Sequence, residues 1–356
     1  MKVLVTGGAG FIGCNAVARY LSRGDHVVCL DNLSRRGADT NLAWLRTITG
    51  SDRLHVSRAD IRNQSDVDEA FAAHPDIEVV VHLAGQVAVT TSVADPRGDF
   101  EANALGTLNI LEAARRVSGL RAFLYASTNK VYGGLESVGV ELVGGRYTFR
   151  DLPSGIPETY PLDFHSPYGC SKGAADQYVI DYARIYGMPN VSLRQSCIYG
   201  PRQLGVEDQG WVAWFTIAAV TGRPITIYGD GLQVRDVLYV DDLLDAYDAV
   251  VNQINDVKGQ AINLGGGPDN VLAIREVLDL ITPRVGHAIP VTHADWRPGD
   301  QRVFVADISR ARELLAWSPR TSVTEGVRQL CDWVVAHRSM FAAIGVTSGQ
   351  SPTSLP

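Results

Sequence analysis

Lysine is rare in this chain of 356 residues. Only Lys2, Lys130, Lys172 and Lys258 are lysines among its 32 basic residues, and no dense run of Lys and Arg occurs. The formal net charge is −7. Proteins that bind nucleic acids present clustered positive charge, so these numbers argue against a nucleic-acid partner. They also give weight to any lysine that falls within a motif.

Cysteine is scarce as well. The five cysteines are scattered without a close pair, and the eight histidines show no ligand spacing. A disulfide framework or a zinc knuckle would need such spacing. We therefore expect no metal site and a reducing compartment, with the cytoplasm as the default location.

Long apolar runs are missing too. The longest, near residues 211–220, is too short to cross a bilayer. The first residues, 1–6, are typical of a strand and not of a secretion signal. No membrane partner is expected. The chain does contain 46 % apolar residues, which is enough for a buried core and argues against global disorder.

Short apolar runs alternate with helix-like segments in the first half of the chain. The runs at 3–5, 26–30, 79–83 and 123–127 are almost entirely apolar, and a good helix lies at about 100–116. Apolar strands that alternate with helices predict a parallel sheet covered on both faces. We predict an α/β fold, with a Rossmann-type doubly wound parallel sheet and a smaller C-terminal α/β substrate domain.

The regular alternation of apolar runs and helix-like segments weakens after about residue 193. This change sets the predicted domain boundaries. Residues 1–190 form the first domain, with returning segments near 225–260. Residues 191–224 and 261–335 form the substrate-binding domain. The small, polar stretch 336–356 is expected to be disordered. The Gly- and Pro-rich stretch 133–161 is expected to be a surface excursion.

A glycine cluster follows the first predicted strand and opens a helix. Gly7 permits a tight turn, Gly10 lets backbone amides approach a pyrophosphate, and Gly13 lets helix and strand pack closely. Phe11 and Ile12 begin the helix, whose unpaired N–H groups favour an anion. The strand–turn–helix context favours a dinucleotide site over a plain structural turn.

Asp31 ends the second predicted strand, 18 residues after the last of these glycines. Its carboxylate would accept hydrogen bonds from the adenosine ribose and repel a 2′-phosphate, which favours NAD over NADP. The positive charges of Arg35 and Arg36 would favour the 2′-phosphate of NADP, but the Asp31 carboxylate occupies the strand end itself. Asn32, Ser34 and Arg35 are expected to share the cofactor site.

Two further segments are assigned to the cofactor. Asp60 and Ile61 follow a short strand and are expected to flank adenine, with a plain helix N-cap as the alternative for Asp60. A second segment follows the next buried strand, and its backbone is expected to run alongside the cofactor ribose. It consists of Leu83, Ala84, Gly85 and Gln86. For Gly85 a simple turn is the alternative.

Tyr168 and Lys172 stand four residues apart, which places them on one face of a helix. A free tyrosine has a pKa near ~10. A cation at about 4 Å with an effective dielectric of about 20 would lower that pKa by about three units. We therefore expect Lys172, together with a positive nicotinamide ring, to make Tyr168 a base. Thr128 ends a strand at the ligand-binding edge, and its hydroxyl can bond the reacting oxygen. The alternative is a surface tyrosine beside a solvated lysine.

With these residues in place, the sequence resembles the extended short-chain dehydrogenase/reductase family over about residues 1–335. The matching pieces are the glycine loop, Asp31, Asp60, residues 83–85, Asn103, Thr128, the Tyr168/Lys172 pair, residues 229–231 with 235–236, and residues 297–300. The resemblance implies cofactor contacts at Asn103 and Ser127. It also implies that Arg235 and Arg297 hold a nucleotide diphosphate, which suits guanidinium geometry.

More specific strings are similar to one group of that family, the CDP-paratose/CDP-tyvelose 2-epimerases. They lie at residues 127–133, 162–172, 208–211 and 300–307, whereas residues 198–202 read like the wider family. The resemblance implies NAD, a CDP-linked sugar, and inversion at C2 through a transient 2-ketose. The implied substrate contacts are Thr128, Asn129, Ser196, Cys197, Gln209, Arg235, Arg297 and Asp300.

Three alternatives remain open. A 4,6-dehydratase of the family typically carries an acid pair after the threonine, where this chain has Asn129 and Lys130. A C4-epimerase differs only in the carbon that faces nicotinamide. A non-catalytic, NAD-sensing binding protein would be expected to lose the Tyr168/Lys172 pair. The resemblance also implies a homodimer or homotetramer formed through helices near 103–116 and 172–187.

Overall fold

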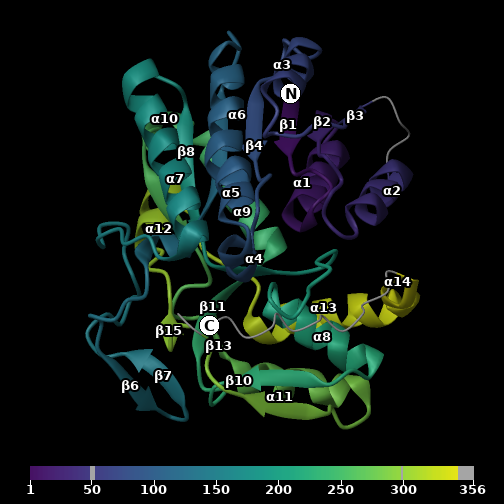
Figure 1. Ribbon diagram of the computed structural model, residues 1–356, viewed down its shortest axis with the longest axis vertical. Coiled ribbons are helices and arrows are strands. Elements are labelled where there is room, and N and C mark those ends of the chain that lie inside the picture. The colour runs from purple at the N-terminus through teal and green to yellow at the C-terminus, as the bar shows by residue number, and fades with distance from the viewer. Residues whose placement is uncertain (49–52, 298–299, 344–356) are drawn as a thin grey trace.

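The computed structural model describes residues 1–48, 53–297 and 300–343. A seven-stranded sheet, whose strand pairs are all parallel, forms the larger part of the molecule (Figure 1). Its strand order is β12-β8-β5-β4-β1-β2-β3. In chain order the strands are β1 (Lys2–Thr6), β2 (His26–Leu30), β3 (Leu54–Ser57), β4 (Val79–His82), β5 (Ala122–Thr128), β8 (Asn190–Gln195) and β12 (Ala261–Leu264).

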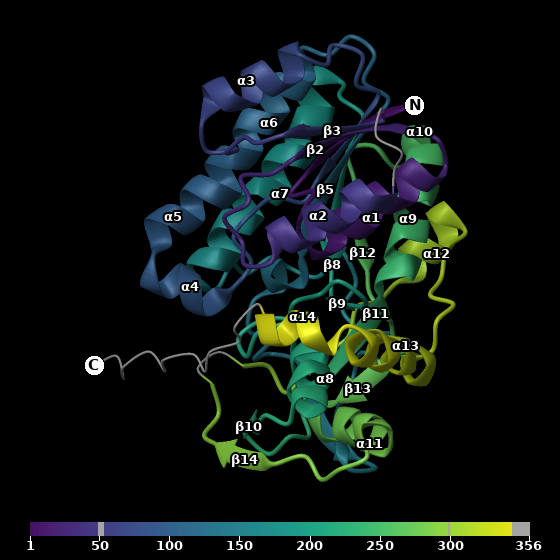
Figure 2. The same cartoon turned by 90° about the vertical axis from the view of Figure 1, so that its right-hand side faces the viewer.

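Helices cover both faces of this sheet (Figure 2). One face carries α1 (Phe11–Ser22), α2 (Ala38–Ile48), α9 (Val240–Asn252), α10 (Ile254–Val257) and α12 (Ser309–Leu315). The other carries α3 (Gln64–Ala72), α6 (Gly106–Arg115) and α7 (Ser166–Tyr186). The short helices α4 (Val89–Ala94) and α5 (Pro96–Phe100) and the π-helix η1 (Glu101–Leu105) lead into α6.

Alternation along the strands explains the two faces. Val3 and Val5 of β1 pack into the core beneath α1 and α2, whereas Leu4 packs into the core beneath α3 and α6. Successive strand side chains point to opposite faces, so a strand buried on both sides must be apolar throughout. The apolar runs of the sequence meet this requirement, and the predicted Rossmann-type class is confirmed.

A smaller region lies below the C-terminal edge of the sheet in Figure 1. Its strands are β9 (Cys197–Tyr199), β11 (Val234–Tyr239), β13 (Val271–Ala273) and β15 (Val303–Phe304), with β10 (Ile225–Tyr228) paired to β14 (Val291–Ala294). Its helices are α8 (Trp211–Thr221), α11 (Ile274–Val285), α13 (Val323–Ala336) and α14 (Arg338–Ala343).

Strand pairing corrects the expected boundaries. Residues 190–195 and 261–264 form β8 and β12 of the large sheet, although the sequence assigned nearly all of them to the second domain. Residues 225–228 and 234–239 belong to the small sheets, whereas residues 240–252 and 254–257 form α9 and α10, which pack on the large sheet. Hydrophobic period reveals a strand but not the sheet that it joins. The division into two domains remains our proposal.

The expected disordered tail also needs correction. Residues 338–343 form α14, which packs on α8, and Phe341 is buried. The rest of that stretch, residues 344–356, lies outside the described residues. Among the described residues, no helix combines the length and the apolar character that a bilayer span requires.

The stretch 133–161 is anchored to the small sheets. It contains the hairpin of β6 (Val140–Val143) and β7 (Arg146–Phe149), and Ile156 forms a bridge with Ala306. The 3-10 turn η2 (Asn129–Tyr132) connects β5 to this stretch. The predicted surface excursion therefore leaves the carboxyl end of β5 and returns to start α7.

Candidate active site

The glycine loop between β1 and α1 is closely packed. Gly7 has φ +65°, and a Cβ there would lie 2.9 Å from the backbone nitrogen of Ala84. A Cβ on Gly13 would lie 2.0 Å from the carbonyl oxygen of Gly7. Gly10 is the N-cap of α1 and supplies no side-chain cap, while Phe11 and Ile12 form the first turn. The helix N-terminus therefore keeps the open amide groups that an anion needs.

Asp31 lies directly after β2 and is buried. Its two carboxylate oxygens accept hydrogen bonds from the backbone N–H of Ala9 at 2.9 Å and of Leu33 at 2.8 Å. The carboxylate thus ties the glycine loop to the segment after β2. A carboxylate offers about four lone-pair sites, so it retains acceptors for ribose hydroxyls.

Asn32, Ser34 and Asp60 gather beside this carboxylate-bearing segment. The Asn32 amide donates to Asp60 at 3.0 Å, and Ser34 bonds to Asn32. Asn63, not Asp60, caps α3, so the alternative role of Asp60 as a plain N-cap is wrong. The Arg62 guanidinium lowers the pKa of Asp60 to about 2. Ile61 is buried against Gly106.

We expect Asp31→Ala to weaken the preference for NAD over NADP by at least tenfold. The variant would remove both the expected ribose acceptor and the negative charge expected to oppose a 2′-phosphate. Titration of each dinucleotide against wild type and variant measures the ratio of the two dissociation constants. An unchanged ratio would remove the main support for this role of Asp31.

The segment after β4 is held by Thr6. The Thr6 hydroxyl oxygen accepts the N–H groups of Leu83 and Ala84, each at 3.1 Å, and lies 2.7 Å from His82 Nδ1. Since that oxygen already accepts twice, its hydrogen is donated to Nδ1. Gly85 lies against Asn103, and Gln86 donates to Asp99 at 2.9 Å.

His82 extends this chain of hydrogen bonds, and sequence reasoning missed it. Its Nε2 lies 3.0 Å from the hydroxyl of Thr107, which itself donates to the carbonyl of Asn103 at 2.6 Å. His82 Nε2 therefore donates, and the ring is neutral. Burial lowers the pKa of His82 to about 3, with Lys172 adding repulsion. The chain links the glycine-loop strand to η1.

This histidine should make folding sensitive to acid. Unfolded His82 binds a proton below its ordinary pKa of about 6.5, whereas folded His82 does so only near 3, so stability falls as pH drops through that window. Between pH 7.5 and 5.5 its contribution should fall by about 1.4 kcal/mol. Urea unfolding of wild type and His82→Gln at both pH values measures it. Equal pH dependence in the two proteins would contradict the assignment.

Thr128, Tyr168 and Lys172 meet at the carboxyl end of β5, and all three are buried. Thr128 is the last residue of the strand, and Tyr168 and Lys172 face it from the first turns of α7. The Thr128 hydroxyl hydrogen-bonds the phenol of Tyr168. Lys172 Nζ donates to the Ala126 carbonyl at 2.6 Å and lies 4.3 Å from the centre of the Tyr125 ring.

The pKa values differ from the sequence-based expectation. Burial raises the pKa of Tyr168 to about 12, although its hydrogen bond with Thr128 and the charge of Arg35 oppose the rise. Burial also lowers the pKa of Lys172 to about 7, opposed by Asp176 and Asp99. The expected lowering counted a nearby lysine cation but omitted the desolvation of both groups. The residues of the chain alone therefore do not produce a phenolate near neutral pH.

A buried carboxylate, Asp99, ties α7 to η1 and to the segment after β4. It accepts hydrogen bonds from Ser171 at 2.5 Å and from Asn103 at 3.1 Å, besides that from Gln86. The Asn103 side-chain oxygen is buried and has no hydrogen-bond partner among the described residues. An orphaned acceptor beside Gly85, the glycine loop and the Asp31 carboxylate together fit a dinucleotide.

A second buried anion, Asp176, stands one turn beyond Lys172. Its carboxylate pairs with Arg194 at 2.9 Å and accepts a hydrogen bond from Ser127 at 2.7 Å. Arg194 also donates to the Tyr132 hydroxyl at 3.2 Å. The predicted residue Ser127 is therefore turned toward this ion pair. Sequence offered only the one-turn spacing from Lys172 as a signal for Asp176.

The two predicted phosphate-binding arginines form separate ion pairs. Arg235 of β11 pairs with Asp300 at 2.6 Å. Arg297 pairs instead with Asp208 at 3.1 Å, and its guanidinium lies 3.9 Å from the centre of the Tyr228 ring. The two arginines are thus held by different carboxylates.

The remaining predicted contacts approach the site from three segments. Asn129 accepts a hydrogen bond from Thr128 at 3.3 Å. Ser196 bonds to Asp236 after β8, and Cys197 starts β9. Gln209 accepts a hydrogen bond from Arg35, so the loop after β2 reaches the segment before α8.

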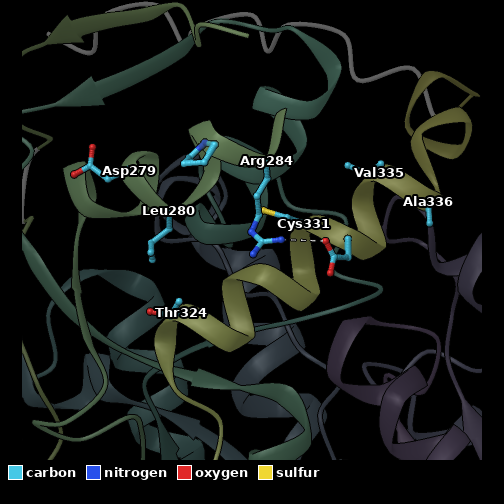
Figure 3. A pocket seen from close by; sticks show the side chains of 9 residues that line it. Asp279, Leu280, Arg284, Thr324, Cys331, Val335 and Ala336 are labelled. Atoms are coloured by element: carbon cyan, nitrogen blue, oxygen red, sulfur yellow. Dashed lines mark hydrogen bonds and ion pairs between the residues drawn. The ribbon is translucent and has the colours of Figure 1, made fainter. Parts of the chain in front are cut away.

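Two other features lie apart from this set. A pocket of 680 Å³ opens between α11 and α13, lined by Arg284, Cys331 and Asp332 among others (Figure 3). It includes none of the predicted residues. Glu136, Asp163 and His165 bring ligand atoms within 4.8 Å of one another at the surface, a grouping that histidine spacing did not indicate.

Known proteins resemble this chain along nearly its whole length. Residues 3–265 match the NAD dependent epimerase/dehydratase family. The CDP-paratose 2-epimerase of Salmonella typhi is 45 % identical over 339 residues, which cover 94 % of this chain and 99 % of that protein. The dTDP-glucose 4,6-dehydratase of Salmonella typhimurium is 33 % identical over 354 residues, 95 % and 93 % of the two chains.

A solved structure resembles the fold as well. The UDP-glucose 4-epimerase of Thermus thermophilus, in complex with NAD, superimposes with a TM-score of 0.77. It is 34 % identical, and the match covers 94 % of this chain and 98 % of that one.

Proposed function

The chain belongs to the NAD dependent epimerase/dehydratase family, and from this membership we propose that it inverts C2 of a CDP-linked hexose. One observation carries the catalytic part of the proposal: Tyr168, Thr128 and Lys172 are buried together at the sheet edge that the glycine loop also reaches. The 45 % identity to a CDP-paratose 2-epimerase supports the choice of carbon and base.

The cofactor is NAD, which when bound takes up a hydride from the sugar carbon and later returns it. Tyr168 in its phenolate form, which the positive charge of bound NAD would favour, accepts the proton of the 2-hydroxyl and gives it back after the sugar has turned. Thr128 holds the reacting oxygen through its hydroxyl. Lys172 stabilises the phenolate, and its place beside Ala126 and Tyr125 fixes its direction. Arg235 and Arg297 anchor the diphosphate, so the hexose can rotate while the nucleotide stays bound.

Dehydration is disfavoured by the residues that follow Thr128. Asn129 and Lys130 occupy these positions, and neither can serve as a carboxylic acid for the elimination of water. The intact Tyr168/Lys172 pair likewise disfavours a binding protein without activity. Inversion at C4 remains the second candidate, because 4-epimerases also match nearly the whole chain.

Product analysis separates these candidates. Purified protein is incubated with CDP-, UDP- and dTDP-linked hexoses, and the proton couplings of each product are followed by NMR. We expect inversion at C2 of a CDP-linked sugar, with no loss of water and no net reduction of NAD. Inversion confined to C4 would replace the proposed reaction, and a 4-keto-6-deoxy product would make the protein a dehydratase.

We also propose a homodimer or homotetramer built on α6 and α7. Three large side chains of α7 are strongly exposed: Tyr178, Ile185 and Tyr186. Exposed apolar groups on one helix are typical of a contact surface. Sedimentation of wild type and of Ile185→Glu tests this surface, and an unchanged mass in the variant would place the contact elsewhere.

The cytoplasm is our proposed location. All five cysteines are free, and Cys14, Cys29 and Cys331 are buried. Free thiols fit a reducing compartment.

A further inference from the structure

Lys130 lies between the catalytic threonine and the proposed phosphate anchor. Its backbone N–H donates to the Thr128 hydroxyl oxygen at 3.2 Å. Its side chain extends toward the smaller region and reaches Gln301, the chain neighbour of Asp300, which pairs with Arg235. One residue of η2 therefore spans the distance from the reaction centre to Arg235.

The ammonium group of Lys130 is weakly held. It donates a hydrogen bond to the side-chain oxygen of Gln301 at 3.3 Å. Gln301 cannot reorient freely, because its amide nitrogen donates to the Gly133 carbonyl at 2.6 Å and the residue is buried. An ammonium carries three donors, so a long bond to a neutral amide leaves it capacity for a ligand.

The charges around Lys130 do not balance. Arg235 repels it, and Asp300 attracts it, but Asp300 is already paired with Arg235 at 2.6 Å. The Cys197 thiol is neutral, since burial raises its pKa. Two cations thus share one carboxylate in partly desolvated surroundings. Burial lowers the pKa of Lys130 to about 8, which shows that its charge lacks compensation. An anionic group would supply it.

We propose that Lys130 is a specificity-determining residue that binds the phosphate joined to the hexose and draws it toward Thr128. The proposal rests on the proposed function, because it assigns Lys130 to the nucleotide sugar of that reaction. Arg235 would hold the same diphosphate from the far side, and Asp300 would keep the two cations apart.

This position bears on which carbon reacts. In a nucleotide sugar the phosphate is attached to C1, and C2 is its direct neighbour, whereas C4 lies across the ring. A cation two residues from Thr128 that binds the glycosyl phosphate brings C1 and C2 near the catalytic hydroxyls. The same cation would hold C4 away from them. Lys130 therefore favours oxidation at C2.

Binding of nucleotides tests the proposal without any need for turnover. CDP and CMP are titrated by calorimetry into wild type, Lys130→Met, Lys130→Arg and the surface control Lys258→Met, all as NAD complexes. We expect Lys130→Met to weaken CDP binding at least tenfold, since a charge-assisted hydrogen bond is lost, and to leave CMP binding within twofold. Lys130→Arg should recover part of the CDP affinity, and Lys258→Met should match wild type.

Other outcomes would overturn it. If Lys130→Met leaves CDP binding unchanged, the phosphate contact does not exist, even if the KM of the CDP-sugar rises. If it weakens CMP and CDP equally, Lys130 supports the structure of the site, and thermal unfolding should then show the damage. Failure of wild type to invert C2 would refute the proposed function and the role of Lys130 in selecting C2, but not its contact with the phosphate. In that case the phosphate contact is tested with the nucleotides that do bind wild type. The binding of UDP is compared with that of UMP, or the binding of dTDP with that of dTMP.

Discussion

Replacement of Tyr168 by phenylalanine is expected to lower kcat by about 10²–10⁴-fold while NAD still binds. The variant keeps the buried ring but removes the hydroxyl that we propose exchanges the sugar proton. The phenol is buried at the end of β5 beside Thr128. Turnover of the nucleotide sugar and titration of NAD measure the two properties separately.

Tyr178→Phe is the matched control. It removes the same hydroxyl from the same helix at a position exposed in the single chain, and it keeps the aromatic ring at the proposed subunit contact. Its kcat should stay within twofold of wild type. Equal turnover in both variants would exclude Tyr168 as the proton acceptor.

Arg194→Met is expected to destabilise the fold by about 3–5 kcal/mol. Arg194 and Asp176 are 4 % and 0 % exposed, so the variant would leave a buried carboxylate without its cation. Ser127 and Ser192 would still donate to Asp176, but neutral hydroxyls do not balance its charge. Denaturant unfolding measures the loss, with the m-value as a check on two-state behaviour.

A surface pair provides the comparison. Arg328 bonds to Glu325 and Asp332, and all three side chains are more than two-fifths exposed. Arg328→Met should leave the free energy of unfolding close to that of wild type, because water screens exposed ion pairs. Similar losses in the two variants would mean that burial of Arg194 adds nothing to the strength of its pairing.

The sequence predicted those parts of the site that depend on local pattern. The glycine spacing at 7, 10 and 13 reflects contacts within one strand–turn–helix unit, and the spacing of Tyr168 and Lys172 reflects one turn of a single helix. Both patterns are short, and their geometry follows from the backbone alone. The fold class followed from apolar runs for the same reason.

Contacts between residues far apart in the sequence could not be predicted from local patterns. Asp99 meets Ser171 from 72 positions away, and His82 links Thr6 to Thr107 through bonds that cross the sheet. Single residues of this kind carry no periodic signal. The pKa of Tyr168 was missed because burial depends on the packing of the whole site, which residue spacing does not reveal.

The contact between Arg35 and Gln209 has a consequence for how long the cofactor stays. Arg35 lies near Asp31 and Tyr168, and it donates a hydrogen bond to Gln209 in the segment before α8. The contact between Arg35 and Gln209 would obstruct the release of a dinucleotide that lies between Asp31 and Tyr168. A redox-neutral cycle has no need to exchange its dinucleotide. The enzyme should therefore retain NAD through dialysis and run in buffer to which none has been added.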